Sequence, residues 1–202
     1  MPISEATVLA LISAAAGLFG VVVGAALPWF RDAWNNKRNA RYLAIRVVCI
    51  LDDFLDQCTD VVGDDGLSLG QRNAGGELRP QVSQPTGLPL PSDVDWRSID
   101  HELMYNVLAL PSRIENDNRF ISIAAEHSFP PDYIEFFEER RHRYACLGLH
   151  VISVTQQLRS TYGISEQELG DWDPITFLNN EKDKIEQRRI DREKNSTVLD
   201  DL

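Results

Sequence analysis

An uncharged apolar stretch near the start of the chain limits what the rest can form. Residues 6–30, ATVLALISAAAGLFGVVVGAALPWF, hold twenty-five positions without a charged side chain. A helix needs about 20 residues, at about 1.5 Å each, to cross the apolar core of a bilayer. We therefore predict a single transmembrane helix at 6–30, preceded by a short extracytoplasmic N-terminus at 1–5. The alternatives are a buried core helix and a cleaved secretory signal, although a signal would need positive charge before the apolar run, where only Glu5 is charged.

Basic residues after the apolar stretch predict its orientation. Residues 31–46 contain five lysines and arginines and one aspartate, a net charge of +4. Such an excess marks the cytoplasmic side of a span, so we expect a single-pass protein with its N-terminus outside and its C-terminal domain in the cytoplasm, in the inner membrane if the source is bacterial. Trp29, Arg31 and Trp34 are expected at the membrane interface. Pro28 is expected to kink or close the helix.

Small residues recur at every fourth position inside the predicted span. Ala16, Gly20 and Gly24 would share one helix face, where a second backbone could approach closely. This spacing predicts self-association, so further copies of the chain are expected partners in a homo-oligomer. The lipid bilayer around the predicted span is the other expected partner.

The remaining chain predicts an all-α domain. Apolar residues follow a helical period in several segments, and no strand-like alternation is found. We expect an antiparallel bundle of three to four helices continuing out of the membrane span. The segments are a stalk and first cytoplasmic helix at 31–62, a flexible Gly/Pro-rich loop at 63–97, a helical bundle core at 98–163, a charged C-terminal helix at 164–195 and a disordered tail at 196–202.

Four local signals predict where the helices after the loop begin and end. Helices are expected to resume near Ser98 or Asp100. Ser112 with Glu115 three residues later has the spacing of a capping box, which would restart a helix after Pro111. Gly163 followed by Ile164 predicts a left-handed C-terminal cap. Asp173 followed by Pro174 predicts an N-cap and a first-turn proline.

Charge and cysteine usage exclude several functions. The chain carries a net charge of −11, and residues 47–202 alone carry −14, so an acidic body would repel the phosphates of nucleic acid. Three cysteines without a Cys-x-x-Cys pair supply too few zinc ligands. We expect no cofactor.

The strongest candidate for chemistry is a Glu-x-x-His pair, Glu139 and His142. Helical bundles that hold two metal ions use this spacing, but they use it twice, and here three arginines at 140, 141 and 143 oppose a dication. We therefore expect a charged surface rather than a metal site. The arginines could instead meet the aspartates of residues 52–65 across the bundle, and those aspartates are otherwise expected on a solvated helix face.

These features favour a protein without catalytic activity. We expect a membrane-anchored cytoplasmic helical module that acts by protein–protein interaction, with a protein partner not identified by the sequence, or by self-association. The alternative is a membrane-perturbing effector that oligomerises through its glycine-rich span. A metal-dependent helical-bundle enzyme is the third possibility.

Overall fold

The computed structural model describes residues 5–167, 170 and 172–200, and for residues 5–23, 25–30, 33 and 196–200 it describes the backbone alone. All named secondary-structure elements of the described part are helices, apart from an isolated bridge between Ser68 and Gln71, which confirms the predicted all-α class. The elements in chain order are α1 (Glu5–Gly63), the 3-10 helix η1 (Trp96–Ser98), α2 (His101–Leu108), α3 (Leu110–Glu126), α4 (Ile134–Tyr162) and α5 (Pro174–Asp200).

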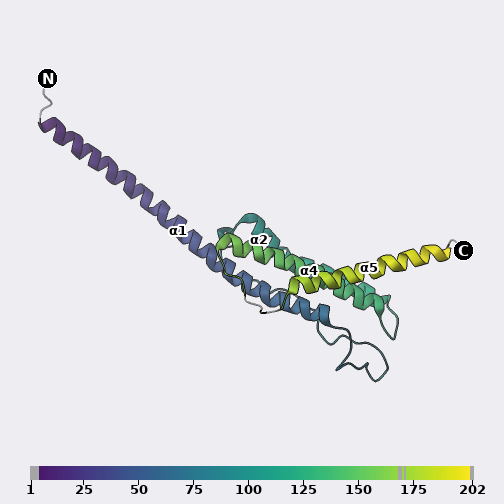
Figure 1. Ribbon diagram of the computed structural model, residues 1–202. Coiled ribbons are helices and arrows are strands. Elements are labelled where there is room, and N and C mark those ends of the chain that lie inside the picture. Colours follow the sequence, from purple (N-terminus) through teal and green to yellow (C-terminus); the bar gives the residue numbers. More distant parts are fainter. Residues whose placement is uncertain (1–4, 168–169, 171, 201–202) are drawn as a thin grey trace.

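Helix α1 joins the predicted span and the first helix of the domain into one element. It runs for 59 residues without interruption, and its N-terminal half extends away from every other helix (Figure 1). The prediction that Pro28 closes the helix is wrong. A proline removes one backbone hydrogen bond, and the residues on both sides of it continue the helix to Gly63.

The described residues include no helix that combines the length and apolar character needed to cross a membrane. The predicted span at 6–30 falls on residues whose side chains, Gly24 apart, lie outside the described part. The membrane span therefore stays a prediction.

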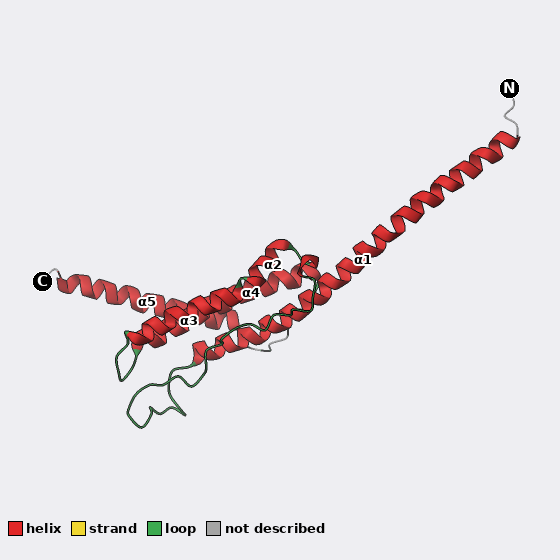
Figure 2. Ribbon diagram, turned by 180° about the vertical axis from the view of Figure 1, so that it is seen from behind, coloured by secondary structure: helices red, strands yellow, loops and turns green. Residues whose placement is uncertain are grey.

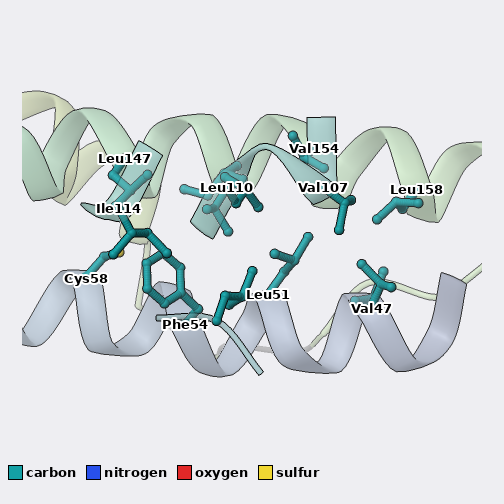
Figure 3. Close-up of a cluster of buried hydrophobic side chains, with 14 of the residues drawn as sticks. Val47, Leu51, Phe54, Cys58, Val107, Leu110, Ile114, Leu147, Val154 and Leu158 are labelled. Carbon is teal, nitrogen blue, oxygen red and sulfur yellow. The ribbon is translucent and has the colours of Figure 1, made fainter. Parts of the chain in front are cut away.

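Helix α4 lies at the centre of the domain and packs against α1, α3 and α5. The chain reverses direction between α3 and α4 and again between α4 and α5, so α4 runs opposite to its neighbours (Figures 1 and 2). Apolar side chains of α1 face those of α2, α3 and α4 (Figure 3). The core residues labelled there are Val47, Leu51, Phe54, Cys58, Val107, Leu110, Ile114, Leu147, Val154 and Leu158, all buried.

Three of the predicted helix ends are confirmed. Asp100 caps α2 by accepting hydrogen bonds from two backbone N–H groups, and Asp173 caps α5 in the same way. Gly163 has φ 62° and ends α4. The capping box at Ser112 is wrong, because α3 already begins at Leu110 and only Ala109 separates it from α2.

The Gly/Pro-rich stretch after α1 lies against the bundle. The backbone N–H of Leu78 donates to the carbonyl of Pro131, and Leu88 is buried. The carbonyl of Pro85 accepts hydrogen bonds from Asn118 of α3 and Tyr144 of α4. The sequence did not predict these contacts, and the flexibility of the segment stays a prediction.

Candidate functional site

The weak metal candidate, Glu139 and His142, lies between α4 and α5. Both carboxylate oxygens of Glu139 are engaged by arginines, Arg143 at 2.6 Å and Arg189 at 2.8 Å. His142 Nε2 lies 3.1 Å from the carboxylate of Glu186 on α5. Among the side chains that the structure describes, no group of three or more His, Cys, Asp or Glu could hold a metal ion.

Further ion pairs join α4 to α5. Arg141 contacts Glu181 at 2.8 Å, and Arg192 contacts Glu138. Burial would raise the pKa of Glu139, but hydrogen bonds from Arg143 and Arg189 lower it below its ordinary value. The predicted charged surface at 139–143 is therefore largely an intramolecular interface.

Arg140 departs furthest from the surface prediction, because its side chain is 1% exposed. Its guanidinium lies 3.1 Å from Asp64 Oδ2, and the Asp64 side chain is also 1% exposed. The guanidinium donates to the carbonyls of Val61 and Val82 at 3.2 and 2.6 Å. Asp64 accepts from the backbone N–H groups of Gly66, Gln81 and Val82. The contact confirms that the arginine run meets the acidic cluster across the bundle, and it overturns the solvated position expected for Asp64.

The main candidate for a binding site is a cavity of about 240 Å³ between α1, α4 and the start of α5. Helix α1 contributes Asp52, Leu55 and Asp56, and α4 contributes Ile152, Thr155, Gln156 and Arg159. The connection to α5 and its first turn complete the lining with Glu166, Gln167, Trp172, Asp173, Pro174 and Ile175.

Two of the lining residues form an ion pair between α1 and α4. Arg159 Nη2 lies 2.5 Å from Asp52 Oδ2, with side chains 12% and 24% exposed. Burial raises the pKa of Asp52, and the hydrogen bond from Arg159 partly offsets that effect. Burial also raises the pKa of Asp56, with repulsion from Asp53 and Asp60 acting in the same direction.

Thr155 is a polar residue of the cavity wall whose hydroxyl has no hydrogen-bond partner among the described residues. The residue is 6% exposed, and its Oγ1 atom is buried without a hydrogen-bond partner. A helical threonine commonly bonds the carbonyl one turn earlier. Thr155 lines the cavity, and neither that bond nor another to its hydroxyl is found among the described residues.

The predicted membrane-interface and self-association residues are only partly described. Arg31 is exposed and Trp34 is 70% exposed. Gly24 is exposed, and a Cβ atom added there would meet no heavy atom within 4 Å. The side chains of Ala16 and Trp29 and the surroundings of Gly20 lie outside the described part.

Sequence reasoning expected Arg140 in a charged surface run and gave Thr155 no role. Each lies on the apolar stripe of α4, because Arg140 stands three residues after Phe137 and Thr155 stands four after Val151. A polar residue at an inward position must find a partner or a ligand. That interruption of the stripe is the signal that could have identified both.

Comparison with known proteins gives no guide to function. The chain matches no protein-family model, and neither the curated proteins nor the solved structures contain a significant match.

Proposed function

We propose that this chain is a membrane-anchored helical module that holds its domain at the cytoplasmic face and engages a protein partner or further copies of itself. The observation that carries the proposal is the continuity of α1. One helix contains the uncharged residues 6–30 and also the buried residues of the domain, from Ala40 to Val62. At about 1.5 Å per residue, a helix of 59 residues extends for roughly 90 Å.

The continuity of α1 would couple the anchor to the domain without a hinge. Described side chains from 31 to 39 are exposed, and Ala40, 5% exposed, is the first buried residue among the described side chains of α1. Arg41 then donates to the carbonyl of Gly163 at the end of α4. An anchored domain of this design keeps a fixed distance and orientation relative to the bilayer.

The charge distribution supports the proposed orientation. Arg31, Arg38 and Arg41 precede the acidic domain on the same helix, beside the exposed ring of Trp34. Basic residues next to a span favour the cytoplasmic side, and indole rings favour the headgroup region.

Membrane extraction and a reporter fusion test the anchor. The full chain should remain in the membrane fraction after an alkaline carbonate wash, whereas a variant that carries Leu11→Arg, Val21→Arg and Val22→Arg should be released, because each central arginine costs about 2.5–3.5 kcal/mol on insertion scales. An enzyme active only outside the cytoplasm, fused after Leu202, should be silent. Recovery of the full chain in the wash would refute the anchor, and an active reporter would refute the orientation.

Self-association is proposed through Ala16, Gly20 and Gly24. The supporting observation is the open surroundings of Gly24, where a second helix has room to approach. Crosslinking in native membranes should yield dimers or larger species that disappear when Gly20 and Gly24 are replaced by leucine. Leucine at Val21 and Val22 is the matched control, because these positions lie on another face of the helix.

A further inference from the structure

We propose that the cavity between α1, α4 and the start of α5 binds a small organic cation, a compound that joins an ammonium group to a short apolar body. This binding activity goes beyond the proposed anchoring role and does not depend on it. Three features of the cavity carry the proposal: its charge, its unpartnered hydroxyl and its size.

The charge of the cavity favours a cation. Among the described lining residues there are four carboxylates, those of Asp52, Asp56, Glu166 and Asp173, and one guanidinium, that of Arg159. Arg159 pairs with Asp52, and Asp173 caps α5. Within the described residues, the carboxylates of Asp56 and Glu166 have neither an ion pair nor a hydrogen-bond donor. An ammonium group beside Asp56 would also relieve its repulsion with Asp53 and Asp60.

Thr155 provides the second, independent feature. Its buried hydroxyl lacks a partner although the residue lines the cavity. Buried polar groups in folded proteins are almost always satisfied by protein or by another molecule. A hydroxyl oxygen can accept a hydrogen bond from an ammonium N–H, which gives the ligand a fixed point on α4.

The size and the apolar walls define the body of the ligand. A cavity of about 240 Å³ is larger than the roughly 150 Å³ space that holds benzene in an engineered protein core. Leu55, Ile152 and Ile175 supply apolar walls, and Trp172 adds an indole ring that is 49% exposed. An indole face also attracts cations. A phenyl or short alkyl group carrying a primary amine matches this lining.

Titration of the full chain in detergent micelles tests the proposal, with 2-phenylethylamine as the probe. Calorimetry should show saturable binding, and the emission of Trp172 should change with the same midpoint. The same titration of Trp172→Phe should lose most of that optical change. The neutral isostere 2-phenylethanol should bind at least about tenfold more weakly, because it lacks the charge-assisted hydrogen bond.

Three variants locate the site. Asp56→Asn should weaken binding of the amine by about tenfold, the usual effect of losing one charged hydrogen bond. Asp60→Asn removes the same charge one turn further along α1, outside the cavity lining, and should leave binding nearly unchanged. Thr155→Val keeps the shape and removes the hydroxyl, so it should weaken binding of the amine by a few-fold while the protein stays folded.

Each alternative outcome contradicts the proposal. Absence of saturable binding would mean that water alone occupies the cavity. Equal binding of the amine and the alcohol would mean an apolar site without charge recognition. Equal effects of Asp56→Asn and Asp60→Asn would mean that the amine responds to the acidic surface in general rather than to this cavity.

Discussion

The guanidinium of Arg140 lies 3.1 Å from the carboxylate of Asp64, and both side chains are 1% exposed. Within the described residues, every further hydrogen bond of the two side chains is to backbone: Arg140 donates to Val61 and Val82, and Asp64 accepts from Gly66, Gln81 and Val82. The pair therefore joins the end of α1, the segment that follows it and the centre of α4. Burial would raise the pKa of Asp64, but the three backbone donors and Arg140 together lower it.

Replacing Arg140 by methionine should destabilise the domain by about 3–5 kcal/mol. The change leaves the carboxylate of Asp64 and the carbonyls of Val61 and Val82 buried with fewer partners, and removal of one member of a buried ion pair has costs of this size. Chemical denaturation of the full chain in micelles, followed by circular dichroism, measures the loss.

Arg97→Met is the matched control for this substitution. Arg97 also pairs with an aspartate, Asp95, but its side chain is 87% exposed. Exposed pairs contribute about 0–1 kcal/mol. Equal losses in the two variants would contradict the structural role of the Arg140 pair.

The segment after α1 should resist proteolysis where it packs against the helices and be cleaved where it is exposed. Leu69 is fully exposed at the tip of the segment, whereas Leu88 is buried. Mild chymotrypsin treatment should therefore cleave after Leu69 well before Leu88. Asn118→Ala removes one of the two donors to the carbonyl of Pro85, at 2.8 Å, and should increase cleavage after Leu88. If the unmodified chain is cleaved after Leu88 as fast as after Leu69, the result would support the flexible loop predicted from composition.

Local sequence signals predicted the helices of this protein well. Asp100, Gly163 and Asp173 act within one or two turns of their own position, so a short window contains the whole interaction. The inward apolar stripe of α1 was predictable for a similar reason, because the residues of a buried helix face recur with the helix period. The prediction that Pro28 closes the helix failed, because the loss of one backbone hydrogen bond does not end a helix whose residues on both sides remain helical.

The sequence suggested that the arginine run could meet the acidic cluster, but it did not identify which distant residues pair. Arg140 meets Asp64 across 76 positions of chain, and Arg159 meets Asp52 across 107. The composition of the segment after α1 gives little apolar surface, yet backbone hydrogen bonds to Asn118, Tyr144 and Arg140 hold it. The cavity likewise needs side chains from α1, α4 and α5 together.

Phe137→Ala should destabilise the domain by about 3 kcal/mol or more, from lost burial and the cavity left behind. Phe137 is 7% exposed and packs against the turn at Gly66, where an added Cβ would lie 2.5 Å from its ring. Ile134, three residues earlier on α4, is 48% exposed. Ile134→Ala is the control and should change the free energy of unfolding by about 0.5 kcal/mol or less. Similar losses for both would contradict this packing.

The contact between His142 and Glu186 should stabilise the protein at acidic rather than alkaline pH. A hydrogen bond to Cys146 raises the pKa of His142; burial opposes this, and Glu186 raises it further, while the charge of Arg189 lowers it. A raised folded-state pKa means that the contribution is complete below the ordinary value of 6.5 and is lost as the pH rises through the higher folded value.

Unfolding measurements at about pH 5.5 and about pH 8.5, on either side of the ordinary histidine range, test this dependence. The difference in free energy of unfolding between the unmodified chain and Glu186→Gln should shrink at the higher pH. Lys182 also lies 3.5 Å from Glu186. The loss of this second contact should contribute to the difference in free energy of unfolding at both pH values. Glu115→Gln, which removes an exposed carboxylate paired with Arg119, is the control and should show no such change. A larger difference at alkaline pH would reverse the assigned sign.

Gly148 and Leu178 set how closely α5 approaches α4, and a double-mutant cycle should reveal their coupling. A Cβ at Gly148 would lie 2.8 Å from Leu178 Cδ1 and 3.4 Å from Cys58 Cβ. Gly148→Leu should therefore overpack the junction and cost about 1–3 kcal/mol, and Leu178→Ala should leave a cavity and cost about 2–5 kcal/mol. In the double variant the new leucine fills the vacated space, so the combined loss should be smaller than the sum by about 0.5–3 kcal/mol. If the losses of stability in the double variant are additive, the absence of a side chain at Gly148 is not what makes room for Leu178.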